Sequence, residues 1–385
     1  MPWWQPWTWG RVEEREALTL EQLLAETGAP TAAGEPVTTD SAMRLSTVWR
    51  CVTLLSDSVS TLPLHVRRGD DPDPIPTPPL LQRPSGDFEE LGDWLWGVMA
   101  SLLLRGNAFG LVTARSGAGL QPAQVDLIHP DHMAVTLDPE SGRTVYRLGG
   151  QVLDPGAVWH VKAYPFPAAP RMPPLGLSPI SHARESIGLG VGAERYAAKL
   201  FGDAAVPAGV LTSDQRITQE QAETLRARWD DRHKGRRAIA VLGDGAKFQA
   251  ITIAPEEAQF IETQKLNTAT IAKFFGLDPR MVGGETGGHM DYSSPEQRST
   301  DFLTYSLRPW LYRVERAVSR LLPRSQSARF NAGGFARATL LDRYTAHKIG
   351  IEAGWLLPSE ARALEDLPPV EGIDDRATPQ GGAVA

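Results

Sequence analysis

The stretch Val282-Gly-Gly-Glu-Thr-Gly-Gly-His-Met-Asp-Tyr292 joins two segments that are typical of long helices. It holds four glycines and almost no side chain that could build a core. The upstream helix is expected from Pro255 to Phe275, because Pro255 suits the first helical position and Gly276 can end the helix. This pattern predicts either a loop held at the end of a rigid support or an ordinary helical hairpin in a globular core.

The downstream helix has a clear expected start. Ser294 can serve as its N-cap, Pro295 suits the first position, and Gln297 completes a capping box. Its apolar stripe at helical spacing consists of Leu303, Leu307, Trp310, Val314, Val318 and Leu321. Pro309 lies inside this helix, where a proline removes a backbone hydrogen bond, so the sequence predicts a kink near Tyr305.

Composition is ordinary for a globular protein of two or three domains. The chain has 385 residues, of which 42% are hydrophobic and 22% charged. We expect no membrane span and no signal peptide, because no apolar run is long enough. The single cysteine, Cys51, permits no intrachain disulfide and is expected in the core. A net charge of −7 argues against a protein that grips nucleic acid, but not against one past which DNA slides.

Periodicity predicts an α+β unit in the first half of the chain. Apolar residues at helical spacing predict helices at Leu45–Leu62 and Phe88–Arg105. Alternation of apolar and polar residues then predicts strands at Phe109–Arg115, Gln124–His129, Met133–Leu137, Thr144–Leu148 and Ala157–Lys162. We expect these strands to form one small antiparallel sheet on the two helices. A further strand is expected at Leu64–Arg68 and another around Arg329–Asn331.

A helix is expected from Ser178 to Phe201, and it carries Gly188, Gly190 and Gly192. We reject a dinucleotide-binding interpretation, because no strand precedes these glycines and their spacing is not G-x-G-x-x-G. Close packing against a neighbouring element is the expected use of the three glycines. After this helix, a small strand–helix–strand insert is expected.

No catalytic template fits the sequence, so we expect no catalytic residue, no cofactor and no metal. The nearest metal pair is His129 and His132, which have no third ligand at suitable spacing. The densest basic cluster could contact nucleic acid or an acidic partner, or form a solvated face. It consists of Arg228, Arg232, Lys234, Arg236 and Arg237. Four tryptophans in the first ten residues could form a strap on the protein's own surface or an anchor for a partner subunit.

Several segments, in this order, resemble the portal proteins of tailed bacteriophages of the HK97 type. They are Val48–Leu64, Leu102–Phe109, Pro174–Ile180, Phe201–Leu211, Ile271–Pro279, Glu296–Pro309 and Gly354–Leu367. No single segment is decisive, and the joint order and spacing over Ser41–Val370 carry the resemblance.

The resemblance implies an α+β portal fold with an α/β wing, a two-helix stem, a small α/β clip, a glycine-rich tunnel loop and a long kinked helix. The implied division is an N-terminal arm and linker (1–40), wing (41–177), stem helix (178–206), clip (207–254), second stem helix (255–279), tunnel loop (280–293), long kinked helix (294–323), C-terminal wing or short crown (324–370) and disordered tail (371–385).

The resemblance also implies a non-enzymatic ring, a dodecamer, at one capsid vertex of the virion, assembled in the host cytoplasm. Large terminase and then a head–tail adaptor would dock at the clip through the basic cluster, and the major capsid protein would be a further partner. Double-stranded DNA would pass through the channel without sequence specificity. The tunnel loop facing DNA would present Gly283, Gly284, Glu285, Thr286, Gly287, Gly288, His289 and Met290.

Two alternatives remain open from the residues alone. The first is a minor capsid or adaptor protein without a channel. The second is a metal-dependent enzyme that uses His129 and His132.

Overall fold

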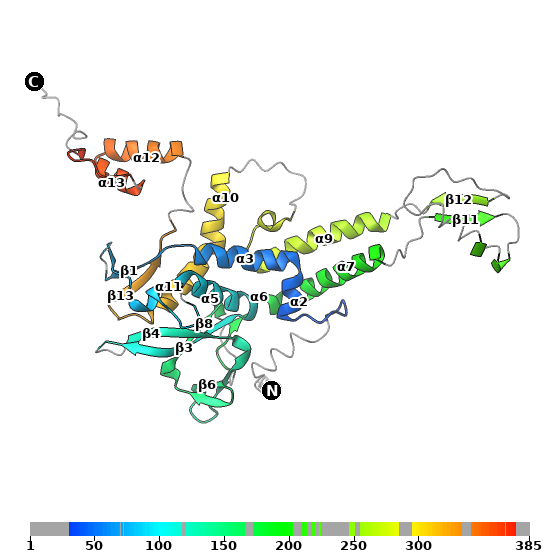
Figure 1. Cartoon of the computed structure of the whole chain (residues 1–385), viewed down its shortest axis with the longest axis horizontal. Helices are drawn as coiled ribbons and strands as arrows, with labels where there is room; N and C mark the ends of the chain where they lie inside the picture. Colours follow the sequence, from blue (N-terminus) through cyan, green and yellow to red (C-terminus); the bar gives the residue numbers. More distant parts are fainter. Residues whose placement is uncertain are drawn as a thin grey trace, which may run out of the picture.

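The computed structural model describes residues 31–374 apart from residues 70, 72, 89, 118–120, 166–171, 203–208, 214–217, 221–222, 225–245, 251–254, 285–294, 333–339 and 366. Helices and short antiparallel sheets are mixed along the described chain (Figure 1). This mixture is the α+β composition that the sequence predicts. None of the described helices is long and apolar enough to cross a bilayer.

Two helices carry the centre of the core. α3 (Ser46–Ser60) and α5 (Leu91–Arg105) pack together and bury the apolar positions from which they were predicted. α3 follows the short helix α2 (Thr39–Arg44), and Cys51 on α3 is buried, as expected. Burial raises the pKa of the Cys51 thiol to about 12, so the thiol stays protonated and unreactive.

Gly106 ends α5, as the sequence predicts. It adopts a φ of 73°, and its N–H donates to the Leu102 carbonyl at 2.9 Å. A Cβ at Gly106 would lie 2.6 Å from the carbonyl oxygen of Gly176, so the position leaves no room for a side chain. The next residue, Asn107, accepts from the Gly176 N–H at 2.8 Å and donates to the Gly176 carbonyl at 3.1 Å.

The strands between residues 107 and 162 form two sheets, so the prediction of a single sheet is wrong. The first sheet has the order β4-β3-β8, with β3 at Asn107–Ser116, β4 at Gln121–Ile128 and β8 at Val158–Lys162. The second has the order β5-β6-β7, with β5 at Met133–Leu137, β6 at Thr144–Leu148 and β7 at Gln151–Leu153. A 3₁₀ turn at Pro130–His132 divides β4 from β5, because proline cannot continue a strand ladder.

A third sheet joins distant parts of the chain. It has the order β13-β1-β2, with β1 at Leu64–Arg68, β2 at Pro74–Ile75 and β13 at Gln326–Phe330. Helix α11 (Arg308–Ser319) lies along the outer edge of β13. There Ser319 Oγ accepts from the Ala328 N–H at 2.9 Å, and Glu315 Oε1 accepts from the Phe330 N–H at 2.8 Å. These side chains accept hydrogen bonds from backbone N–H groups that an edge strand would otherwise leave unpaired.

Two long antiparallel helices run side by side away from the body (Figure 1). They are α7 (Arg184–Gly202) and α9 (Pro255–Phe274). The predicted helix from Ser178 is thus divided at Ala183 into α6 (Pro179–His182) and α7. Strands β11 (Gly209–Ser213) and β12 (Ala246–Ala250) pair with each other beyond the outer ends of the helices. The other short elements are α4 (Pro79–Gln82), β9 (Tyr164–Pro165) and β10 (Gly176–Leu177).

Gly188 and Gly190 of α7 allow close packing, as predicted, whereas Gly192 does not require it. A Cβ at Gly188 would lie 2.4 Å from Thr31 Oγ1, and a Cβ at Gly190 would lie 2.7 Å from Asn267 Nδ2 on α9. Their neighbours are therefore α9 and the segment 31–37. That segment is held on α7 by the bond of Arg195 to Glu35 Oε1 at 2.6 Å.

Two C-terminal helices form a separate pair (Figure 1). They are α12 (Leu340–Glu352) and α13 (Pro358–Leu364). Glu365 joins them by accepting from Arg343 at 2.7 Å and by a contact with His347 at 3.0 Å.

Candidate functional site

The candidate site is the described structure on either side of residues 285–294, which we call the base. Its first part is the end of α9, where Gly276 has a φ of 69°. The Gly276 N–H donates to the Lys273 carbonyl at 3.0 Å, and the Leu277 N–H donates to the Ala272 carbonyl at 3.0 Å. This pair of bonds is a Schellman motif, which closes the helix and fixes the direction in which the chain leaves it. Leu277 is buried, so the base is attached to the core.

A 3₁₀ helix at Pro279–Val282 continues this base. Asp278 caps it by accepting from the Arg280 N–H at 3.0 Å, and it pairs with the Arg280 guanidinium at 2.7 Å. These contacts with Arg280 lower the pKa of the Asp278 carboxyl. Gly283 then adopts a φ of 84°, and the Gly284 N–H donates to the Pro279 carbonyl at 2.7 Å.

The chain returns to the body through an irregular helix. α10 (Pro295–Asp301) passes into a π-helix at Phe302–Leu307, which passes into α11. The Arg308 N–H donates to the Leu303 carbonyl, five residues back. The π-helix lies at the position where the sequence predicts a kink, near Tyr305, and Pro309 has no N–H for the Tyr305 carbonyl.

The two sides of the base are joined directly. Ser306 in the π-helix donates from Oγ to the Gly276 carbonyl at 2.6 Å. Phe302 and Leu307 of the π-helix are buried in the main core, together with Phe275 at the end of α9. Residues 285–294 therefore depart from and return to one packed base.

The structure describes only part of the predicted site. Gly283 and Gly284 lie at the end of the 3₁₀ helix, where they direct the chain into the loop. Outside the described residues lie the remaining predicted loop residues, Glu285, Thr286, Gly287, Gly288, His289 and Met290. The basic cluster at 228–237, the capping residue Ser294, the tryptophan-rich start and residues 375–385 also lie outside them.

The sequence analysis did not predict the Asp278–Arg280 and Ser306–Gly276 contacts. The dipeptide Asp278-Pro279 is a usual start for a short helical turn and could have indicated the first contact. No local sequence signal indicates the second, since its partners are 30 residues apart.

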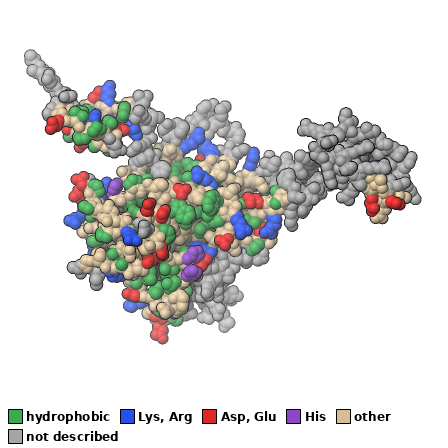
Figure 2. Space-filling view, viewed as in Figure 1, with side chains coloured by type: hydrophobic (Ala, Val, Ile, Leu, Met, Phe, Trp, Pro, Cys, Tyr) green, Lys and Arg blue, Asp and Glu red, His purple; other side chains and the backbone are tan. Residues whose placement is uncertain are grey.

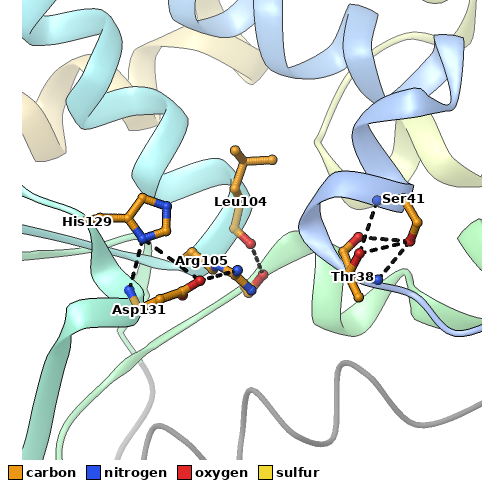
Figure 3. Close-up of polar contacts among 7 residues, drawn as sticks. Thr38, Ser41, Leu104, Arg105, His129 and Asp131 are labelled. Carbon is orange, nitrogen blue, oxygen red and sulfur yellow. Dashed lines mark hydrogen bonds and ion pairs between the residues drawn. The ribbon is translucent and has the colours of Figure 1, made fainter.

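His129 and His132, the residues of the metal hypothesis, lie at the turn between β4 and β5. Figure 3 shows the side chains of His129 and Asp131 near Arg105. Arg105 pairs with Asp131 Oδ2, the carboxylate that a metal at His129 would need. Within the described part of the chain, no three His, Cys, Asp or Glu residues gather in a metal-binding group. The arrangement does not favour cation binding, because Arg105 already supplies the positive charge.

His160 on β8 is a half-buried structural histidine. Its Nε2 lies 2.9 Å from Asn107 Oδ1, its Nδ1 lies 3.3 Å from the Tyr146 hydroxyl, and its ring stacks on Phe109. Because Asn107 Oδ1 can only accept, Nε2 donates and Nδ1 accepts from Tyr146. Burial, with the nearby charges of Lys162 and Arg320, lowers the pKa of His160 to about 3.

Comparison with known proteins identifies the family. A family model described as "Phage portal protein" matches residues 46–366. The chain belongs to the phage portal protein family. The probable portal protein of Streptomyces phage phiC31 is 31% identical over 390 residues, which cover 95% of this chain and 84% of the relative. The portal protein of Enterobacteria phage HK97 is 25% identical over 373 residues, which cover 91% and 86%.

Two solved structures share the fold of this portal-family chain. A chain from the neck of a native gene transfer agent particle, computed with C12 symmetry, matches with a TM-score of 0.61 and 22% identity, over 90% of this chain and 98% of the other. An HK97-family phage portal protein from Corynebacterium diphtheriae matches with a TM-score of 0.50 and 16% identity, over 79% and 97%. At these identities the match shows the fold alone, which is consistent with the predicted portal fold, while the division into wing, stem, clip and tunnel loop stays a prediction.

Proposed function

We propose that this chain is the subunit of a portal ring at one capsid vertex, through which DNA enters and leaves the particle. The family match over residues 46–366 carries this proposal. A ring of twelve copies is supported by the C12 symmetry named for the similar neck structure. The proposed role is structural, with no reaction catalysed by this chain.

The base described above suits the proposed tunnel loop, residues 280–293. A loop that meets moving DNA must adjust its shape while its ends stay fixed. Gly283 and Gly284 supply the adjustable start, and the Ser306–Gly276 bond fixes the ends to each other. In this proposal α7 and α9 are the stem, and residues 207–254 are the clip that meets the large terminase and later the head–tail adaptor.

Exposed apolar side chains on the proposed stem support contact between copies. Leu189 and Tyr196 on α7 are 45% and 57% exposed, and Leu266 on α9 is 66% exposed. In a ring, a surface of one copy contacts a different surface of the neighbouring copy, which is called a heterologous contact. We propose that neighbouring copies cover these side chains.

DNA would pass without sequence-specific binding. Each copy has a net charge of −7, and we propose a mostly acidic or neutral channel wall that repels phosphate rather than holding it. The major capsid protein would surround the body of the ring, residues 41–177 and 324–370.

Electron microscopy of the purified full chain, classified by symmetry, tests the proposal. We expect closed rings of twelve copies with an open channel.

Leu266→Asp should reduce the fraction of rings, because it places a charge in the proposed contact between copies. Val152→Asp, at a 64% exposed position on β7, is the matched control and should leave rings intact. Monomers that persist after addition of major capsid protein would reject the ring and favour an adaptor without a channel.

A further inference from the structure

An arginine-lined groove of about 420 Å³ lies between α11 and β13. Its four arginines come from the helix, from the turn that follows and from the strand. They are Arg316, Arg320, Arg324 and Arg329. We call this feature the arginine groove.

The local structure explains why the arginines gather. Arg316 and Arg320 are four residues apart at the end of α11, so they lie on one side of it, while Val314 and Val318 enter the core. On β13, Ala328 is buried and Arg329 is exposed, as alternation along a strand requires. The packing of α11 against β13 therefore brings both sets of guanidinium groups to one groove.

The positive charge of the groove is largely uncompensated. Its acidic residue, Glu315, already accepts from the Phe330 N–H at 2.8 Å and from Arg329 at 3.3 Å. The Arg316 guanidinium lies 5.6 Å from the centre of the Tyr312 ring. Within the described part of the chain, no carboxylate pairs with Arg316, Arg320 or Arg324.

The field of these charges extends into the protein. After burial, the charge of Arg320 is the second cause that lowers the pKa of Lys162. It also contributes to the lowered pKa of His160. A positive potential that acts on neighbouring cations will also attract an anion from solvent.

The side-chain types of the lining suit a phosphate polymer. Besides its four arginines, the groove is lined by the polar side chains of Ser319, Gln326 and Ser327. Arginine, serine and glutamine side chains are typical contacts of the sugar–phosphate backbone. Such contacts carry no sequence information.

We propose that the arginine groove binds the phosphate backbone of double-stranded DNA, outside the channel and without reading bases. The inference rests on the proposed function in one respect, since that function brings double-stranded DNA to this protein. It goes beyond that function because passage through a channel requires no binding site on α11 and β13.

The test measures binding of a short fluorescent DNA duplex to the full-length protein by anisotropy over a range of salt concentrations. Arg320→Glu/Arg324→Glu should weaken binding about tenfold or more and reduce the salt slope by about 2, roughly one per lost phosphate contact. Arg44→Glu/Arg50→Glu is the matched control, because it makes the same charge change at exposed arginines on α2 and α3. Equal losses in both variants, or no loss in the groove variant, would reject the site. Thermal unfolding of each variant confirms that it is folded.

Competition identifies the ligand class. If the duplex binds at the groove, poly-glutamate and inorganic phosphate should displace it only at much higher concentration. Displacement by poly-glutamate at lower concentration than by unlabelled duplex would instead identify an acidic protein segment, and displacement by millimolar phosphate would identify a free anion.

Rings that form without groove-dependent DNA binding reject this inference alone. Groove-dependent binding by a protein that forms no ring rejects the proposed function alone.

Discussion

The hydroxyl of Ser306 donates a 2.6 Å hydrogen bond to the backbone carbonyl of Gly276, which ends α9 30 residues earlier. Gly276 precedes residues 285–294 in the chain, and Ser306 follows them. This hydrogen bond, together with the buried side chains of Phe275, Phe302 and Leu307, therefore joins the two sides of the base of the proposed tunnel loop.

Ser306→Ala should destabilise this base. It removes the Ser306 donor and leaves the Gly276 carbonyl without that partner, so we expect the free energy of unfolding to fall by about 1–2 kcal/mol. Chemical denaturation of the purified protein measures the change. Ser325→Ala, at an exposed serine, is the control and should change stability by less than about 0.5 kcal/mol. Equal stability of the two variants would contradict the assigned role of Ser306.

Gly106→Ala and Gly142→Ala separate backbone strain from crowding. Both glycines have a positive φ, 73° and 65°, so each substitution should cost about 1–2 kcal/mol through strain. A Cβ at Gly142 has no atom within 4 Å, whereas one at Gly106 meets the carbonyl of Gly176 at 2.6 Å. Gly106→Ala should therefore cost a further 1–3 kcal/mol, roughly, through overpacking. Denaturation midpoints that agree for the two variants would show that the β9–β10 region moves aside.

Gly188→Ala and Gly192→Ala should have opposite effects on the same helix. At Gly192 a Cβ would lie 3.6 Å from the nearest atom, so alanine should stabilise α7 by up to about 1 kcal/mol. At Gly188 a Cβ would meet Thr31 Oγ1 at 2.4 Å, so alanine should displace the segment 31–37. Limited proteolysis, read by mass spectrometry at that segment, should show faster cleavage in Gly188→Ala alone. Unchanged cleavage would mean that the segment does not depend on this contact.

His160 should make stability depend on pH. Its pKa is about 3 in the folded protein, below its ordinary value of 6.5, so the unfolded chain binds a proton in this range while the folded protein does not. Stability should therefore fall by up to about 1.4 kcal/mol for each pH unit from pH 6 to pH 4. His160→Gln should flatten this slope in denaturation series across that range. A slope that the substitution leaves unchanged would contradict the assignment.

Local patterns predicted the elements well. The spacing of apolar residues located α3 and α5, and Gly106 and Gly276 ended helices where a positive φ is needed. Pro309 located the irregular turn, although it did not specify a π-helix, because several local geometries can accommodate a missing N–H.

Contacts between distant segments were not predictable from one sequence. The pairing of β6 with β7 was not predicted, because β7 has three residues and no buried side chain, so its periodicity is too short to detect. The bond of Trp159 Nε1 to the Ala317 carbonyl at 2.8 Å joins β8 to α11, and neither residue carries a local signal for it. The arginine groove arises in the same way, since α11 and β13 form it only after they pack together.

The pairing of β1 with β13 has a consequence for synthesis of the chain. Leu64 lies opposite Phe330, and Arg68 lies opposite Gln326, so strands from nearly opposite ends of the chain are adjacent. A ribosome completes β1 long before it reaches β13, and domains otherwise tend to fold as they emerge. Until residue 330 leaves the exit tunnel, β1 has only the two-residue β2 as a partner, and its long edge is open to other nascent chains. Completion of the body, and with it any assembly of copies, therefore waits until residue 330 has been synthesised.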